Sequence, residues 1–354
     1  MKKNLYILFF ISQLAISQSV RKYSNEFLNI GVDAAAFGMG KAVVATSNDV
    51  NSIYWNPAGL TAVKEYQGAI MHAEYFAGIA KYDYAGFAMP IDDKSALGIS
   101  LIRFGVDDIL NTTELIDNEG NIDYNRISLF SAADYALNIG YARQSRIEGL
   151  TIGGNVKIVR RIIGDFATSW GFGIDAALQY QRNDWKFGLM LRDITTTFNS
   201  WSIDENEFEK IKNSILDQNQ ELPESTEITL PKAQLGIAKQ FIFSKDFNLL
   251  TEVDLNLRFT KTNDLISSDI VSIDPALGFQ VGYMNTVFLR GGIGNMQNEL
   301  QFDNSKELVF QPNFGVGFKY KGIQLDYALT NIASIGNALY SNVFSIKIAF
   351  DNFK

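Results

Sequence analysis

One acidic segment has the ligand spacing of a calcium loop. Asp117, Glu119, Asn121 and Asp123 place side-chain oxygens on alternate residues around Gly120, as calcium loops do. The bidentate glutamate that completes such a loop is missing, because the twelfth residue is a serine. We therefore expect a polar turn on the outside of the protein and no bound metal.

The other candidates for catalysis are weak. The chain has one histidine, His72, and no cysteine, which excludes disulfides and thiolate chemistry and does not favour a zinc site. A lone histidine in a strand is more often a packed or lumen residue than a base. Glu252 and Asp254 lie two residues apart near Arg258, and we interpret them as a charge network inside a barrel. We expect no enzymatic activity and no cofactor.

Three glycine-rich fragments, residues 171–173, 291–294 and 315–317, look like pieces of dinucleotide-binding motifs. None of them opens a helix after a strand in a βαβ unit, so the geometry that cradles a phosphate is not predicted. Glycines on the inner face of a barrel leave room for a plug or allow a strand to bend. The fragments are weak support for a filled lumen.

The N-terminus has the parts of a signal peptide. Lys2 and Lys3 precede an apolar stretch at residues 5–16, and a small-x-small cleavage site ends the segment. A membrane-anchoring helix would need about 18 apolar residues, and this stretch is shorter. We expect residues 1–17 to be removed and the mature chain to be exported.

The composition suits an outer-membrane barrel. Hydrophobic residues make up 47% of the chain and aromatic residues 13%, with many glycines and few prolines. The formal net charge is −8, and no cluster of cations appears. This argues against nucleic-acid binding, which needs clustered positive charge.

Strict alternation of apolar and polar residues runs through most of the chain. In the last strand Phe344, Ile346, Ile348 and Phe350 share one face, and Ser345, Lys347 and Ala349 share the other. A period of two describes a strand between two unlike environments, which are either the core and surface of a sandwich or the lipid and lumen of a barrel. We expect about fourteen such strands, at residues 67–76, 84–91, 95–104, 132–143, 150–162, 170–181, 185–192, 232–241, 248–259, 276–283, 287–294, 312–320, 323–329 and 340–351.

Two strands favour the barrel. The strand at 248–259 places Glu252, Asp254 and Arg258 on one face, which is no hydrophobic core, although in a sandwich this row could face water. The strand at 170–181 has aromatic ends around an aliphatic middle, as a lipid-facing strand does. An even strand number also lets the last strand pair with the first and leaves no open edge in lipid. The predicted fold is an all-β, transmembrane antiparallel β-barrel over residues 66–354.

The connections between strands alternate between short and long. Residues 182–184 and 321–322 are tight turns, whereas long outer loops are expected near 107–131 and 195–230. Within the second loop, Asp204 followed by Glu207 predicts the start of a short amphipathic helix that reaches Leu216. This helix is either a lid or docking surface, or part of a solvated loop.

Residues 18–65 are expected to form an N-terminal hatch, or plug, in the lumen. Small residues dominate residues 29–46, so this part can pack closely inside the barrel. A turn follows in which proline fixes φ and glycine relieves the backbone. Its residues are Asn56, Pro57, Ala58, Gly59 and Leu60.

These features resemble the long-chain fatty acid transporter superfamily, whose barrels have fourteen strands, a hatch and an Asn-Pro-Ala motif. The chain looks most like the PorV/PorQ family of type IX secretion outer-membrane proteins, and in particular its PorV-like branch. The glycine-rich start through Asp49, the turn at 56–60 and the segments 112–117 and 130–136 carry this resemblance. The last strand departs from the usual assembly signal, because residues 351–354 run past its alternation.

The resemblance implies a non-enzymatic barrel in the cell outer membrane, surrounded by outer-membrane lipid. It would bind translocon or attachment-complex proteins and secreted cargo domains through its outer loops and lumen rim. The candidate docking residues are Thr112, Glu114, Asp117, Glu119 and Asp123. The alternatives are a transporter of hydrophobic small molecules, with a ligand or lipid in its lumen, and a purely structural barrel.

Overall fold

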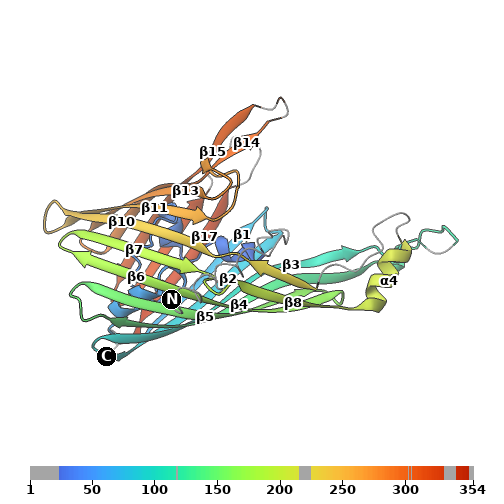
Figure 1. Cartoon of the computed structure of the whole chain (residues 1–354), viewed down its shortest axis with the longest axis horizontal. Coiled ribbons are helices and arrows are strands. Elements are labelled where there is room, and N and C mark those ends of the chain that lie inside the picture. Colours follow the sequence, from blue (N-terminus) through green and yellow to red (C-terminus); the bar gives the residue numbers. More distant parts are fainter. Residues whose placement is uncertain are drawn as a thin grey trace, which may run out of the picture.

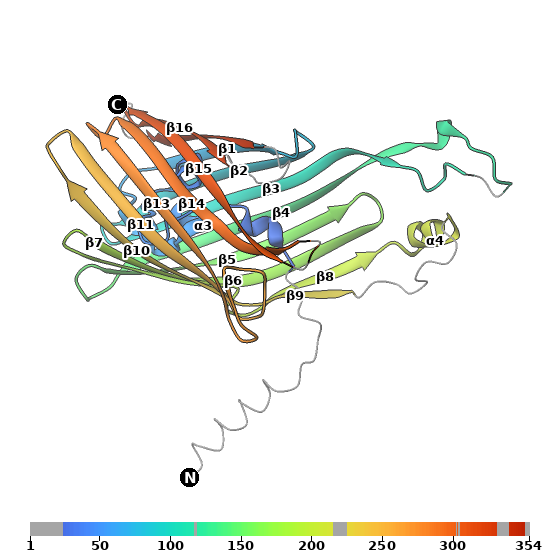
Figure 2. The same ribbon diagram turned by 90° about the horizontal axis from the view of Figure 1, so that it is seen from above.

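A computed structural model describes residues 24–116, 119–214, 225–301, 303, 305–330 and 340–350, so the expected signal peptide lies outside the described residues. Fourteen antiparallel strands form a closed barrel (Figures 1 and 2). In order around the barrel they are β1 (Gln67–Tyr75), β2 (Ala80–Asp92), β3 (Ser95–Asn111), β4 (Ser128–Gln144), β5 (Leu150–Ile163), β6 (Ala167–Arg182), β7 (Trp185–Arg192), β10 (Lys232–Ile242), β11 (Phe247–Arg258), β13 (Ser272–Tyr283), β14 (Val287–Leu300), β15 (Lys306–Tyr320), β16 (Ile323–Thr330) and β17 (Ser341–Ala349).

The last strand closes the barrel as predicted. β17 pairs with β16 on one side and with β1 on the other, where Ile346 lies opposite Ile70 and Phe344 opposite His72. Phe344 is 56% exposed on the outer face, whereas Ser345 is buried on the inner face. The same alternation leaves Trp170 and Phe172 of β6 exposed outside and Asp175 buried inside. The apolar rows are therefore the outer wall of the barrel, and the sandwich alternative is wrong.

The two ends of the barrel differ. Short turns such as 93–94, 183–184 and 321–322 connect strands at one end, here called the turn end. The longer connections lie at the other end, the loop end, where β3 and β4 project well beyond the neighbouring strands (Figures 1 and 2). Both strands extend into the range expected as loop, because a bulge between Val106 and Ile109 shifts the alternation and hides the end of β3 in the sequence. No helix in the described part of the chain is long and apolar enough to cross a membrane.

Two barrel strands are interrupted at the same level. After β7, residues 193–196 leave the strand, and β8 (Thr197–Ile203) resumes pairing with β6. On the returning chain β9 (Thr226–Thr229) pairs with β8, and Leu230 and Pro231 separate it from β10. A further short strand, β12 (Ile266–Ser267), pairs with β13 in a loop.

The predicted helix in the long insertion is confirmed. α4 (Glu205–Ser214) follows β8, and the Asp204 carboxylate accepts the backbone N–H groups of Asn206 and Glu207 at 2.9 and 3.2 Å. This satisfies free donors at the start of the helix. Ile215 and Leu216 of the predicted helix lie outside the described residues.

A buried ion cluster stabilises the interruption after β7. The Lys157 ammonium of β5 lies 2.9 Å from Asp175 Oδ1 and 2.6 Å from Asp193 Oδ1. The backbone N–H of Asp193 also donates to Asp175, at 2.7 Å. All three side chains are almost fully buried, so one cation balances two carboxylates where the strand turns inward.

We predict that Lys157→Met lowers the free energy of unfolding by about 3–5 kcal/mol, because it leaves two buried carboxylates without a counter-charge. Urea unfolding of the barrel in lipid vesicles, followed by tryptophan fluorescence, measures the change. Lys261→Met is the matched control, since Lys261 forms an ion pair with Asp269 at the same 2.9 Å but with both side chains exposed, and should have no measurable effect. Equal effects of the two variants would contradict the role of the buried cluster.

Candidate functional site

The N-terminal segment lies inside the barrel. This hatch segment, residues 24–65, contains η1 (Glu26–Asn29), α2 (Ala34–Gly38), α3 (Ser52–Trp55) and η2 (Pro57–Ala62), and α2 contacts β14, β15, β16 and β17. Lumen glycines allow the close fit, because a Cβ at Gly188 would collide with the Val44 carbonyl and one at Gly278 or Gly292 with the backbone of Met39. The glycines at 291–294 thus partly support the filled lumen that the sequence predicted. Gly292 and Gly294 approach the hatch, whereas Gly291 lies under Phe279.

Two carboxylates of β11 hold the hatch backbone. The N–H groups of Val43 and Val44 donate to Asp254 Oδ2 at 2.9 and 3.1 Å, and the N–H of Ala45 donates to Glu252 Oε1 at 2.6 Å. The Thr46 hydroxyl donates to the other oxygen of Glu252. Both carboxylates are almost completely buried. They bind the hatch and do not form the network with Arg258 that their spacing suggested, because Arg258 pairs with Asp264 at 2.5 Å.

The opposite wall holds the hatch through a lysine. Lys347 of β17 lies 3.2 Å from Asp33 and 2.9 Å from Asp49, which are both hatch residues. Ser345 on the same face donates to Asp33 at 3.0 Å. The polar face of the last strand therefore binds the plug while its apolar face forms the outer wall.

The Asn-Pro-Ala-Gly-Leu turn connects the hatch to a third part of the wall. The Asn56 amide donates to the carbonyls of Val44 and Leu178 at 2.9 and 3.1 Å, and its oxygen accepts the N–H of Ala58 at 3.1 Å. Pro57 occupies the first position of η2. All five motif residues are buried.

Glycine is needed in this turn for space. The sequence suggested that Gly59 relieves the backbone, but Gly59 is absent from the positive-φ glycines of the described chain. A Cβ at this position would collide with the Ser47 carbonyl oxygen and lie 2.7 Å from Ser52 Oγ. The turn therefore packs directly against the hatch backbone.

We predict that Gly59→Val prevents the hatch from closing, because the new side chain cannot fit beside Ser47. Asn56→Ala should have a smaller effect in the same direction, since it removes hydrogen bonds without a clash. Protease sensitivity of the hatch in the assembled barrel is the measurement. Ala62→Val introduces the same valine side chain at an exposed position of the same η2 helix and should behave as wild type. A Gly59→Val barrel whose hatch stays closed and protected from protease would contradict the prediction.

We also predict that Glu252→Gln combined with Asp254→Asn loosens the hatch. Hydrogen bonds to charged acceptors contribute about 1.5–3 kcal/mol each, and this variant weakens several of them at once. Single-barrel conductance in planar bilayers should show more frequent open events than wild type. Asp246→Asn, in an exposed turn, is the control, and identical conductance for both variants would count against the carboxylate anchor.

A large cavity lies at the loop end, above the hatch. This outer vestibule has a volume of about 860 Å³, within the range of ligand sites. Hatch residues such as Phe37 and Trp55, with Tyr75 of β1, line an apolar side, and charged and amide side chains of β7, β10, β11 and β13–β15 line the other. A smaller cavity of about 240 Å³, the inner cavity, lies at the turn end, and Trp55 lines both.

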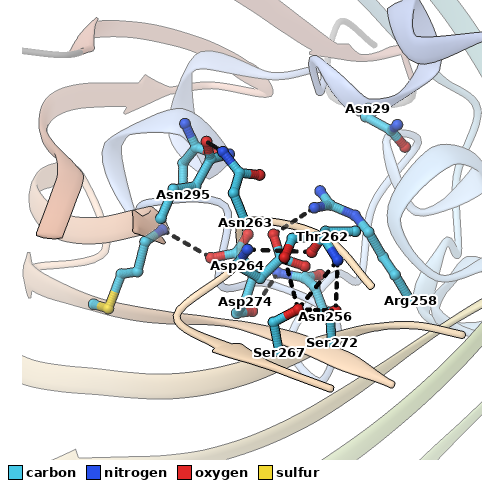
Figure 3. Close-up of polar contacts among 12 residues, drawn as sticks. Asn29, Asn256, Arg258, Thr262, Asn263, Asp264, Ser267, Ser272, Asp274 and Asn295 are labelled. Atoms are coloured by element: carbon cyan, nitrogen blue, oxygen red, sulfur yellow. Dashed lines mark hydrogen bonds and ion pairs between the residues drawn. The ribbon is translucent and has the colours of Figure 1, made fainter. Parts of the chain in front are cut away.

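The rim of the outer vestibule is a dense polar loop (Figure 3). In this close-up Arg258 points from β11 toward Asp264, while the carboxylate of Asp274 accepts the N–H of Met296 at 2.9 Å. Ser272 donates to the Thr260 carbonyl at 2.7 Å and accepts the N–H of Thr262 at 3.0 Å. These contacts fix the loop above the cavity without closing it.

The predicted docking residues lie on the projecting β3–β4 arm, residues 107–131. Thr112, Glu114, Glu119 and Asp123 lie in its terminal loop, and Asp117 lies outside the described residues. The Asp123 carboxylate accepts the N–H of Asn125 at 3.0 Å and lies 3.6 Å from Arg126, so it does not point at a shared cation. The described residues contain no group of three or more His, Asp or Glu that could hold a metal.

The sequence interpretation missed the apolar part of this arm. Ile116 and Ile122 form a bridge across the loop, yet their side chains are 61% and 58% exposed, and Tyr124 is 72% exposed. Isolated apolar residues in a polar turn carry no periodic signal. Their common exposure at the tip appears only in the structure.

The expectation for His72 was wrong. Its neighbours Met71 and Ala73 occupy the inner face of β1, so His72 has the other parity and lies half-exposed outside. Its Nδ1 lies 2.7 Å from Asp83 Oδ1. Asp83 is also 3.8 Å from Arg103 Nη1. The histidine belongs to a charged row near the loop end of the outer wall.

A closed barrel with an apolar outer face and a hydrogen-bonded internal hatch defines an outer-membrane β-barrel. The sequence pattern of the family described as Type IX secretion system protein PorV matches residues 15–263. The chain belongs to this family, whose members are transport and secretion components. A comparison with curated protein sequences finds no match.

Solved structures with the same fold include transporter barrels. A Pseudomonas aeruginosa FadL homologue is 11% identical with a TM-score of 0.52, and the alignment covers 90% of this chain and 98% of that one. The CymD monoaromatic hydrocarbon channel is 13% identical, with a TM-score of 0.55 and coverage of 93% and 99%. The P. putida toluene transporter TodX is 14% identical, with a TM-score of 0.53 and coverage of 90% and 99%. At these identities the likeness concerns the fold.

Proposed function

We propose that this protein is a non-enzymatic docking barrel of the type IX secretion system, which binds translocon or cargo proteins through the β3–β4 arm. The match to the PorV family supports a role in type IX secretion. The observation that supports the docking role is the exposed apolar tip of the arm, formed by Ile116, Ile122 and Tyr124. The arm extends beyond the rest of the barrel (Figure 2).

The chemistry of the arm suits a protein partner. Exposed apolar side chains surrounded by polar residues are typical of protein interaction sites, and an aromatic residue at the centre supplies much of the binding energy in many interfaces. Glu114, Glu119 and Asp123 provide the polar rim around the tip. The adjacent bridge between Ile116 and Ile122 gives the tip a defined hairpin shape.

The second candidate function is transport of hydrophobic small molecules, which the fold of the FadL homologue and the hydrocarbon channels supports. The charge of the outer vestibule argues against transport of hydrophobic molecules. Its lining includes Lys41, Arg192, Lys232 and Arg258, and charged groups in a pocket are costly to desolvate for an apolar ligand. We therefore place docking first.

We predict that Ile122→Asp with Tyr124→Asp reduces export of type IX cargo about tenfold, because it puts charge at the centre of the interface. The measurement is cargo in the medium and on the cell surface, with barrel assembly checked by its heat-modifiable gel mobility. The matched control is Leu300→Asp with Leu308→Asp, on the exposed β14–β15 hairpin at the same end. Normal export in the arm variant, or an equal loss in both, argues against docking; intact export with lost uptake of a hydrocarbon would favour transport.

A further inference from the structure

The outer vestibule is lined by more cationic than acidic side chains: Lys41, Arg192, Lys232 and Arg258, against Glu26 and Asp274. Lys232 lies 3.5 Å from Glu26, and Arg258 pairs with Asp264. Lys41 and Arg192 form no salt bridge with any carboxylate in the part of the chain that the structure describes. Both line the cavity, where Asp274 offsets part of the charge of Lys41, so a net positive charge is left to attract an anion.

The two groups are held in place by other contacts. The Arg192 guanidinium donates to Gln234 Oε1 at 2.8 Å and to the Tyr54 carbonyl at 2.9 Å, and it lies over the Tyr54 ring. The Lys41 ammonium lies 5.4 Å from the centre of the Phe37 ring. A pre-positioned cation loses little conformational entropy on binding an anion.

Side-chain amides line the same cavity as these cations. Amides both donate and accept hydrogen bonds, as peptide groups do. They can therefore hydrogen-bond to a polypeptide backbone, whereas a hydrocarbon has no groups to pair with them. The amides that line the cavity include Gln234, Asn256, Asn295, Gln297, Gln311 and Asn313.

We propose that the outer vestibule binds an acidic polypeptide segment, with Lys41 and Arg192 as the groups that receive its carboxylates. The cavity is lined by residues at the loop ends of the strands, the same end of the barrel as the docking arm. The inference rests on the proposed docking function and adds to it the chemistry of the bound segment.

The ionisation of Lys41 gives the site a pH dependence. Burial lowers the pKa of Lys41 to about 8, with Asp274 of β13 opposing the shift and Arg258 of β11 adding to it. Lys41 is therefore charged below pH 8 and loses its charge above it. Glutamate carboxylates stay ionised over this range. Any weakening of binding between pH 7 and pH 9 should therefore come from the loss of charge on Lys41 and not from the peptide.

The test uses the purified full-length barrel in detergent and N-acetylated hexaglutamate as the probe, measured by isothermal titration calorimetry at low salt. Hexaglutamine is the uncharged control. We expect hexaglutamate to bind and Lys41→Gln to weaken it about tenfold, as expected for one lost charge-assisted contact. Raising the pH from 7 to 9 should weaken binding to wild type but not to Lys41→Gln.

Lys186→Gln is the matched variant, because it removes one positive charge from the inner cavity on the opposite side of the hatch and should leave binding unchanged. Equal binding of the two peptides, or an equal loss in both lysine variants, overturns the proposal. Binding of laurate without binding of hexaglutamate also overturns the proposal, because it indicates that the cavity binds an amphiphile. If hexaglutamate does not bind but the arm variant still loses export, the inference about the vestibule is wrong and the proposed docking function is retained.

Discussion

A plug that fills a membrane barrel must have its backbone hydrogen bonds supplied by the barrel wall, because unsatisfied buried N–H groups are costly. The rest of this structure depends on that requirement. Asp254 and Glu252 accept consecutive hatch amides, Asn56 joins the hatch to β6, and Lys347 binds the hatch carboxylates from the far side. The polar inner faces of the strands are thus the complement of one particular segment.

The two faces of each strand also have different roles: the outer face contacts lipid and the inner face contacts the hatch. Away from the charged row at His72, the outer positions are mostly apolar, and one aliphatic residue facing lipid can replace another. The inner rows are specific, because a carboxylate or a glycine is required at each point where the hatch approaches. Gly188 and Gly278, which contact the hatch directly, belong to the second kind. The interrupted strands at β7 and β9 follow the same logic, with Lys157 and its two carboxylates occupying the gap on the inner face.

The strands could be predicted from the sequence because lipid outside and protein inside impose a period of two on long segments. Trp170 and Phe344 lie on the outer wall as that period requires. The bulge at Val106 broke the period and hid the extension of β3. The site was less predictable, because Asp254 and Val43 are 211 residues apart in the sequence and spacing says nothing about such contacts. The cavity and the exposed arm tip depend on three-dimensional packing in the same way.

The contacts of Asp33 have a consequence for biogenesis. Asp33, in the N-terminal hatch, binds Lys347 and Ser345, which are more than 300 residues away in the last strand. Contacts that span nearly the whole polypeptide form late, because the entropy cost of closing so large a loop precedes any gain. The hatch is therefore among the last parts of the chain to reach its native position, and a hatch bound at Asp33 indicates that the last strand is in place.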